Sequence, residues 1–281
     1  MWRMIDMIPF FMTLGIVLGV LLVSALLYLL VFIRPRGRQP SDPALLCDYA
    51  HRGLHNETIP ENSLSAFKRA CEQGCGIELD VQLSRDGVVM VFHDYALARM
   101  TGAEGKLRER DASELQKLKL SGSDQTIPTF AEVLELVGGR VPLLVELKGE
   151  NLDTSLCEKV ADHLRTYPGP YCIESFNPLL LRRMKQFLPE TYYGLLYTNT
   201  CRDKKSHSLL NLLVTAMMLN FLARPHFIAY NQLDRDSLPV KLTTRLYRAP
   251  RFVWTVRSDE TFNLAHKLGE HPIFENLTEQ P

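Results

Sequence analysis

Short apolar runs alternate with helical stretches from residue 45 to the carboxyl terminus of this 281-residue chain. This alternation is typical of parallel βα units, in which each strand is followed by a helix. Residues 45–281 come close to the roughly 250 residues of a barrel built from eight such units. The sequence therefore predicts an α/β fold, a (β/α)8 TIM barrel over residues 45–281. The eight expected strands end near His51, Asp80, Glu146, Ser175, Leu196, Tyr230, Val256 and Glu275.

Helical stretches lie between most of these strands. Ser63 is a suitable N-cap for the first of them, and Pro60 keeps the chain extended before it. Residues 95–125 are interpreted as an insertion with one helix at 112–120. The other expected helices cover residues 63–73, 129–137, 152–166, 178–187, 209–223 and 258–268.

An Asp86-Gly87 pair separates two apolar-rich runs, residues 78–85 and 88–93. Asp-Gly between such runs is a strong hairpin signal, and the connection is too short for a parallel crossover. A two-residue turn would place Asp80 opposite His93, with Glu78 on the same face of the strand as Asp80. We therefore expect a β-hairpin insertion at the mouth of the barrel, the face on which barrel enzymes hold their catalytic groups.

Three carboxylates, those of Glu78, Asp80 and Glu146, lie at the carboxyl ends of expected strands. Carboxylates gathered around one point repel each other unless a cation lies among them. Oxygen ligands without cysteine or paired histidine favour Ca²⁺ or Mg²⁺ over zinc. We therefore predict a site for one divalent cation, Ca²⁺ or Mg²⁺. The alternative is that these carboxylates form ion pairs with Arg52 and Lys148.

Two histidines, His51 and His93, are expected on opposite sides of this cation site. Imidazoles titrate near neutral pH, so the pair can act as a general base and a general acid. Arg52 and Lys148 would place positive charge beside them, where it can bind an anionic group. The remaining histidines are expected to be structural, namely His55, His163, His207, His226, His266 and His271.

A series of short motifs, in order along the chain, resembles the glycerophosphodiester phosphodiesterase family of the phospholipase C-like phosphodiesterase superfamily. The motifs are HRG at 51–53, PENS at 60–63, ELDV at 78–81, RDG at 85–87, FHD at 92–94, IPTF at 127–130, ELK at 146–148 and WTV at 254–256. The resemblance implies the barrel and the metal-ligand role of the three carboxylates. It also implies roles for His51 and His93 in proton transfer and for Arg52 and Lys148 in binding the phosphate of the substrate. It also implies a place for Glu61 just behind the site, as a hydrogen-bonding group.

The chain departs from the family pattern at two places. Arg257 stands where the family usually has asparagine, and residues 273–276 read IFEN where it usually has Ile-x-Thr-Asp. Neither position is a metal ligand, so we expect these departures to affect substrate choice rather than catalysis. Trp254, at the barrel mouth, would either stack against a substrate or pack within the barrel.

The resemblance implies metal-dependent hydrolysis of glycerophosphodiesters to glycerol 3-phosphate and an alcohol, in phospholipid and glycerol metabolism. One alternative is lysophospholipase D-like or phospholipase-type hydrolysis of membrane lipids by the same site. A second alternative is a catalytically inactive membrane scaffold, against which the complete set of histidines and carboxylates argues. With 32 basic and 32 acidic residues, the chain offers no reason to expect a nucleic-acid partner. The six cysteines lack metal-ligand spacing and are expected to be free thiols.

Residues 7–33 contain no charged residue and exceed the roughly 20 apolar residues that cross a bilayer. The apolar run continues directly to Arg34, which favours a retained transmembrane helix over a cleaved secretory signal. We therefore predict a single-pass membrane protein with a tail at 1–6, a transmembrane helix at 7–33 and a linker at 34–44.

The basic residues flanking this helix predict its orientation. Arg34, Arg36 and Arg38 follow it, whereas only Arg3 and the terminal amine precede it, so the barrel is expected in the cytoplasm. Gly15 and Gly19 form a GxxxG spacing that would let two such helices pack as a homodimer.

Residues 209–223 are unusually apolar for a barrel helix, which normally has a polar outer face. The segment is too short to span a bilayer. Two interpretations stay open: a helix buried against the barrel, or a segment lying in the membrane interface. Lys204 and Lys205, just before it, would suit the anionic headgroups of membrane lipids.

Overall fold

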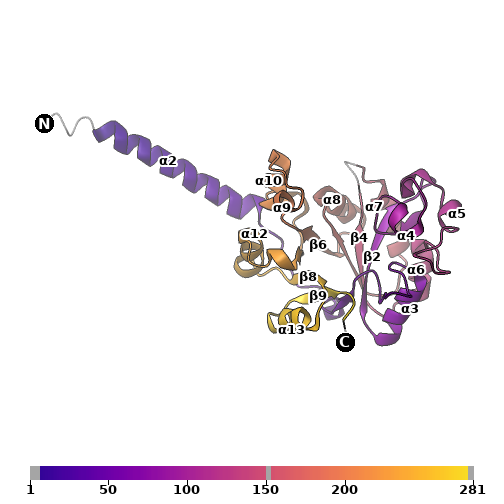
Figure 1. The fold of residues 1–281 in the computed structure, drawn as a ribbon. Coiled ribbons are helices and arrows are strands. Elements are labelled where there is room, and N and C mark those ends of the chain that lie inside the picture. Colours follow the sequence, from indigo (N-terminus) through magenta and orange to yellow (C-terminus); the bar gives the residue numbers. More distant parts are fainter. Residues whose placement is uncertain (1–6, 150–152, 278–281) are drawn as a thin grey trace.

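The computed structural model describes residues 7–149 and 153–277 and shows a closed barrel of eight parallel strands with helices around it (Figure 1). Strand β1 pairs with both β2 and β9, which closes the sheet into a barrel. The predicted TIM barrel is confirmed, with every expected strand in place. The barrel strands are β1 (Tyr49–Ala50), β2 (Gly76–Leu83), β4 (Leu143–Leu147), β5 (Tyr171–Ser175), β6 (Tyr192–Tyr197), β7 (Phe227–Asn231), β8 (Arg251–Val256) and β9 (His271–Phe274).

The helices begin and end at capping residues that the sequence contains. Ser63 caps α3 by accepting a hydrogen bond from the Ala66 amide, and Gly74 ends the helix with a left-handed backbone. The larger barrel helices are α3 (Leu64–Gln73), α6 (Phe130–Val137), α7 (Ser155–Leu164), α8 (Pro178–Phe187) and α13 (Asp259–Lys267). The expected amino-terminal end of α7, at residue 152, lies outside the described residues.

The expectation of one helix over residues 209–223 is wrong. The segment forms α10 (Leu209–Thr215) and α11 (Asn220–Ala223), and α9 (Thr200–Asp203) precedes them. Met217, between α10 and α11, has a φ of 50°, a left-handed conformation that a continuous helix does not contain. Two further short helices, α12 (Leu238–Lys241) and the π-helix Leu242–Leu246, precede β8.

The barrel interior changes from apolar to acidic along single strands. Leu144 on β4 and Cys172 on β5 belong to a buried apolar cluster inside the barrel. Alternate residues of a strand face the same side, so Glu146 and Glu174, two residues further on, also point inwards. The carboxyl ends of the strands therefore bring acidic side chains together above an apolar floor.

The hairpin is present, but its register differs by one residue from the prediction. Strand β3 (Val89–Val91) pairs antiparallel with β2, and Val81 lies opposite Val91. The turn has three residues instead of two, because the Ser84 amide donates to the Val88 carbonyl at 3.0 Å and Gly87 takes a φ of 79°. Asp80 therefore lies opposite Phe92 instead of His93, and the Phe92 amide donates to the Asp80 carbonyl at 2.9 Å.

The insertion after the hairpin carries more helical structure than expected. It contains α4 (Ala98–Thr101), a 3-10 turn at Leu107–Glu109 and α5 (Ala112–Leu115), so the predicted helix at 112–120 ends early. Its apolar side chains form a separate buried cluster with Met90 and Phe92 of the hairpin. The apolar side chains of the insertion therefore pack against the hairpin, and Gln116 also donates a hydrogen bond to Glu132 of α6.

Helix α2 (Met7–Leu27) continues as a π-helix over Tyr28–Phe32 and projects from the barrel (Figure 1). Its apolar stretch, Pro9–Phe32, meets the length and composition of a bilayer span, as amino-terminal signal sequences also do. The tail at 1–6 lies outside the described residues.

The carboxyl end of this helical segment is bound to the barrel. The Tyr28 hydroxyl donates to the Ala216 carbonyl at 2.9 Å, and the side-chain amide of Asn220 donates through Nδ2 to the Ile33 carbonyl at 2.8 Å. The Tyr247 hydroxyl donates to the Leu29 carbonyl at 2.5 Å. The linker is also attached, because the Arg36 amide donates to the Pro225 carbonyl at 2.8 Å.

Candidate active site

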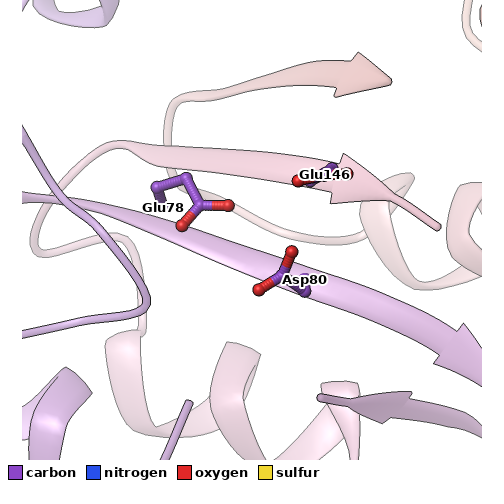
Figure 2. Close-up of side chains that lie close together, drawn as sticks. All are labelled: Glu78, Asp80 and Glu146. Atoms are coloured by element: carbon purple, nitrogen blue, oxygen red, sulfur yellow. The ribbon is translucent and has the colours of Figure 1, made fainter. Parts of the chain in front are cut away.

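Glu78, Asp80 and Glu146 form an acidic cluster at the carboxyl ends of β2 and β4 (Figure 2). Asp80 and Glu146 are register partners on these neighbouring strands, and Glu78 lies two residues before Asp80. All three are buried, and one oxygen of each lies within 4.8 Å of the others. Buried carboxylate oxygens at this spacing fit a hard divalent cation such as Ca²⁺ or Mg²⁺.

Two side-chain cations also contact this cluster. Lys148 Nζ lies 3.1 Å from Asp80 Oδ1 and 2.9 Å from Glu146 Oε1, and Arg52 Nε lies 3.5 Å from Asp80 Oδ2. The ion pairs considered as the alternative to a metal site are therefore formed in part. Glu78 accepts a hydrogen bond from the Arg52 backbone amide at 2.9 Å.

The pKa values of the three acids diverge because the cations neutralise them unequally. Burial works to raise the pKa of Asp80, but Lys148, His93 and Arg52 overcome it and hold that pKa far below its usual range. Burial and the charges of Asp80 and Glu146 raise the pKa of Glu78 well above normal. Burial raises the pKa of Glu146 to about 7 against the effect of Lys148. A cation at this point would relieve the repulsion that keeps Glu78 and Glu146 from ionising.

Glu174, at the end of β5, is a fourth buried acid that the sequence analysis did not single out. It is 1% exposed and lines a cavity at the barrel mouth together with Glu78 and Glu146. Its Oε2 atom has no hydrogen-bond partner among the described residues. Burial and the charges of Glu146 and Asp80 raise its pKa well above normal. Glu174 in the YCIES run is the register partner of Glu146 on the neighbouring strand. An acidic residue near the end of an apolar run is the sequence signal that could have identified it.

The acids at this mouth outnumber the cations that contact them. Glu174 and the three clustered acids give four carboxyl groups, against the side-chain cations of Arg52 and Lys148. If all four ionised, an excess of negative charge would remain, because Arg52 is also paired with Glu61. A divalent cation would reduce this excess, so the donor atoms and the sign of the charge both fit such a cation.

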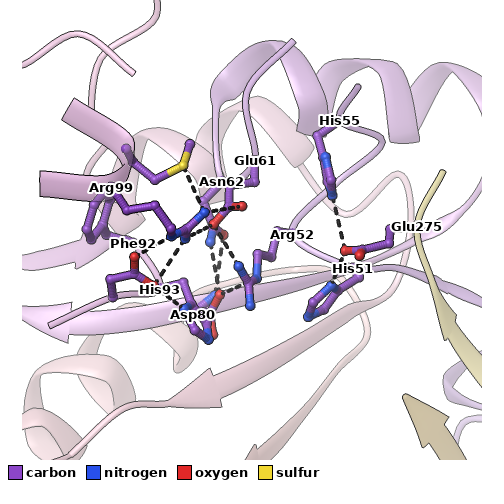
Figure 3. Close-up of polar contacts among 12 residues, drawn as sticks. His51, Arg52, His55, Glu61, Asn62, Asp80, Phe92, His93, Arg99 and Glu275 are labelled. Atoms are coloured by element: carbon purple, nitrogen blue, oxygen red, sulfur yellow. Dashed lines mark hydrogen bonds and ion pairs between the residues drawn. The ribbon is translucent and has the colours of Figure 1, made fainter. Parts of the chain in front are cut away.

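His51 is held by a carboxylate that the family resemblance did not suggest. Its Nδ1 lies 2.7 Å from Glu275 Oε2, at the end of β9, and His55 Nε2 approaches the same oxygen at 3.5 Å (Figure 3). Arg257 forms an ion pair with the other oxygen of Glu275. The two departures from the family pattern are thus partners of each other, and through Glu275 they reach a candidate catalytic residue. His55, expected to be structural, also lies beside this carboxylate.

His93 is held in the same way from the other side of the cavity. Its Nδ1 lies 2.6 Å from Asp94 Oδ1, and Arg99 Nε donates to Asp94 Oδ2 at 2.5 Å (Figure 3). Arg99 also donates to Glu61, which in turn accepts from Arg52 Nη1 at 2.7 Å. Glu61 therefore contacts both Arg52 and Arg99, and it connects Arg52 to the insertion.

Burial lowers the pKa of both histidines. Hydrogen bonding to Glu275 opposes this for His51, and the charge of Asp80 opposes it for His93. Each imidazole uses Nδ1 to bind a carboxylate, which leaves Nε2 available to a ligand. A neutral imidazole with an available Nε2 can accept a proton from a bound hydroxyl or water, and a protonated imidazole can donate one from the same atom.

Most of the predicted residues line a cavity of about 200 Å³ at the barrel mouth, whereas Asp80 and Glu61 lie outside its lining. Its polar side contains His51, Arg52, Glu78, His93, Glu146 and Lys148. Its apolar wall contains Trp254, whose indole packs edge-to-face on Phe176 with ring centres 5.6 Å apart. The indole Nε1 donates to the Ala229 carbonyl at 3.0 Å, so Trp254 is fixed by the barrel while it lines the cavity.

The closed barrel and the acidic cluster define a class, that of (β/α)8-barrel proteins with a candidate divalent-cation site flanked by paired histidines. The family model described as "Glycerophosphoryl diester phosphodiesterase family" matches residues 51–279. The chain belongs to this family.

Individual relatives agree with this assignment. A glycerophosphodiester phosphodiesterase of Caldanaerobacter subterraneus subsp. tengcongensis is 40% identical over 161 residues, covering 53% of this chain and 65% of that protein. Glycerophosphodiester phosphodiesterase 1 of Homo sapiens is 28% identical over 148 residues, covering 49% of this chain and 44% of that protein. The chain thus matches less than two thirds of the length of these relatives.

Solved structures match over most of their length. A glycerophosphodiester phosphodiesterase of Thermotoga maritima has a TM-score of 0.63 and 28% identity, over 81% of this chain and 94% of that one. A phosphodiesterase of Oleispira antarctica, solved in complex with the product sn-glycerol-3-phosphate, has a TM-score of 0.67 and 24% identity, over 82% and 92%. The similarity to the Oleispira antarctica structure shows that the two chains share a fold.

Proposed function

We propose that this chain hydrolyses glycerophosphodiesters to glycerol 3-phosphate and an alcohol. The observation that carries the proposal is the pair of histidines, each bound through Nδ1 to a carboxylate, on either side of an acidic cluster in one cavity. Family membership supports it, as does the product bound in the Oleispira antarctica relative.

The proposed chemistry uses the two Nε2 atoms in succession. One imidazole takes the proton of the glycerol 2-hydroxyl as its oxygen attacks phosphorus. The bond from phosphorus to the alcohol oxygen then breaks, and the second imidazole, which enters the reaction protonated at Nε2, transfers that proton to the leaving oxygen. A water molecule opens the resulting cyclic phosphate by the reverse proton movements, which gives glycerol 3-phosphate.

The cations of the cavity orient the phosphate in this proposal. Lys148 and Arg52 are held at the acidic cluster and present positive charge to non-bridging phosphate oxygens. We propose that Glu78, Asp80 and Glu146 hold one divalent cation, Ca²⁺ or Mg²⁺. When bound, such a cation would polarise a phosphate oxygen and offset the charge that develops on it.

We further propose that α2 anchors the protein in a membrane, with the barrel in the cytoplasm. The uncharged span Pro9–Phe32 and the arginines that follow it support this. Leu209, Leu210 and Leu212 of α10 are between 48% and 73% exposed, close to the Tyr28 contact at Ala216. Their exposure favours the membrane-interface interpretation of this segment over a buried barrel helix.

A second candidate substrate class is the lysolipids, cleaved by the same site. Phe176 is 43% exposed on the apolar wall beside Trp254, where an acyl chain or a larger alcohol would contact it. A homodimer through Gly15 and Gly19 remains a further proposal, since both glycines have open space beside them.

One assay tests the activity and its alternative. Full-length protein in detergent is given glycerophosphocholine or lysophosphatidylcholine, and release of choline and of glycerol 3-phosphate is measured. Wild-type protein should hydrolyse the glycerophosphodiester, and His51→Ala and His93→Ala should each lose roughly 10²–10⁴-fold in rate. If either variant keeps more than about a tenth of wild-type activity, the role proposed for that histidine is refuted.

A further inference from the structure

A second, strongly cationic cavity lies at the point where α2 meets the barrel. It encloses about 690 Å³. None of the described residues that line it carries a carboxylate. The lining residues are Arg34, Pro35, Arg36, Arg182, Lys185, Phe221, Leu222, Ala223 and Arg224.

Three distant segments of the chain build this cavity. Arg34 and Arg36 follow α2, Arg182 and Lys185 lie on α8, and Arg224 follows α11. The segments are joined by hydrogen bonds: Lys185 Nζ donates to the carbonyls of Ala223 and Arg224 at 2.5 and 2.8 Å. The cavity is therefore part of the folded barrel and not only a property of the linker.

The positive charges in this cavity have no carboxylate partner in the part of the chain that the structure describes. Among the residues that the structure describes, none of its four guanidinium groups forms an ion pair. This contrasts with Arg52 and Arg99 at the barrel mouth, which are paired with carboxylates. Burial and the nearby charge of Arg36 lower the pKa of Lys185 to about 8. Five cations held together without a counter-charge repel each other, so an anion would stabilise the arrangement.

The position of the cavity indicates which anion this is. Arg34 follows the end of the apolar span at Phe32 by two residues, so a bilayer around α2 would have its headgroups at this level. The ring of Phe221 packs edge-to-face on that of Phe32, with centres 5.6 Å apart. The cavity thus has cationic walls and an apolar rim on the side of α2, which suits a phosphate joined to acyl chains.

We propose that this cavity binds the phosphate headgroup of an anionic phospholipid from the bilayer that contains α2. The proposal rests on the proposed membrane attachment and is independent of the catalytic site. A charge signal that orients the helix explains Arg34 and Arg36, but it does not explain the cations contributed by α8 and by Arg224. A soluble phosphate carries the same anionic group, but it has no acyl chains that could contact the apolar rim.

The test is native mass spectrometry of full-length protein in detergent, titrated with phosphatidylglycerol or phosphatidylcholine. Phosphatidylglycerol should bind at least tenfold more tightly. The triple variant Arg36→Gln, Arg182→Gln and Arg224→Gln should lose about fivefold in affinity per cation, and so about a hundredfold in total. Inorganic phosphate at millimolar concentration should compete only weakly. Equal binding of the two lipids, or complete displacement by phosphate, would overturn the proposal.

A matched variant removes three exposed cations elsewhere, through Lys68→Gln, Lys117→Gln and Lys267→Gln. It has the same net charge as the triple variant, and it should bind phosphatidylglycerol like the wild type. An equal loss in both variants would show non-specific attraction and refute the site. If the triple variant does not fold, Arg224→Gln alone replaces it, with an expected loss of about fivefold.

Two further measurements separate this proposal from the others. Hydrolysis of a soluble diester by the triple variant should equal that of the wild type. Retention of the wild type and of the triple variant in carbonate-washed membranes measures only whether α2 is inserted in the bilayer. Loss of the wild type from those membranes would refute the attachment, whereas loss of lipid selectivity in detergent would refute the headgroup site.

Discussion

Replacing Glu275 with glutamine tests whether the carboxylate beside His51 takes part in catalysis. The side chain of Glu275 is 11% exposed and lies 2.7 Å from His51 Nδ1, and it does not line the cavity. A hydrogen bond to a charged group contributes about 1.5–3 kcal/mol. Because about 1.4 kcal/mol corresponds to tenfold in rate, Glu275→Gln should lower kcat by about 10- to 150-fold. KM should change little, since Glu275 is not in contact with the cavity.

The pH dependence of the variant gives a second, independent measurement. Burial lowers the pKa of His51, and the hydrogen bond and charge of Glu275 oppose that effect. Without the carboxylate the pKa of His51 should fall further. The limb of the kcat/KM profile that reports the titration of His51 should therefore move to lower pH. A role for Glu275 in folding alone would leave that limb in place.

Arg257 provides the matched control. Arg257→Gln removes the ion pair with Glu275 but keeps the contact to His51, so kcat should change less than about threefold. The assay is the release of glycerol 3-phosphate from glycerophosphocholine over pH 5–9. If Glu275→Gln keeps more than half of the wild-type kcat and an unchanged pH profile, the carboxylate does not assist His51.

Three further predictions concern the cation and the stability of the fold. Chelation should abolish activity reversibly, and Asp80→Asn should raise the metal concentration needed for half-activity at least tenfold; full activity in chelator would contradict this. Glu174→Gln should weaken calorimetric Mg²⁺ or Ca²⁺ binding about tenfold at unchanged stability, and unaltered affinity would exclude Glu174 from the charge balance. His226, whose Nδ1 accepts from the Tyr193 amide at 2.9 Å, has a folded-state pKa lowered to about 3 by burial and the charges of nearby basic side chains. Its stabilisation is present above its unfolded pKa of about 6.5 and is lost as pH falls towards 3, so urea unfolding should show a loss on the order of 1–2 kcal/mol between pH 7 and 5. His226→Asn should flatten this dependence, and an equally steep one would refute the assignment.

The barrel was predictable because its signals are local. Each strand is a short apolar run, most of these runs end in or beside a polar or charged residue, and helix caps such as Ser63 are visible in the sequence. The parallel order of the strands brings those strand ends to one face, so Glu78, Asp80 and Glu146 could be grouped before any contact was known.

The parts that were not predicted depend on contacts between distant residues or on turn geometry. The pairing of Arg257 with Glu275 joins two positions that the sequence analysis treated as unrelated. The hairpin register depends on the length of its turn, and Asp86 helps to set that length by accepting hydrogen bonds from Ser84 Oγ at 2.6 Å and from the Ala112 amide at 3.0 Å. The network through Arg99 requires the insertion to fold back over the mouth, which no periodicity in residues 95–125 indicates.

The attachment of α2 to the barrel would limit which substrates can reach the proposed active site. Contacts at Tyr28, Ile33 and Tyr247 hold the helix against the barrel, and the linker is bound at Arg36 instead of swinging freely. In a membrane, the catalytic mouth would therefore stay at one height and one tilt above the lipid surface. A soluble diester diffuses to that mouth from any direction, whereas a lipid has to arrive at the one position the mouth occupies. Geometric access, rather than binding strength, would then decide between soluble and membrane-embedded substrates.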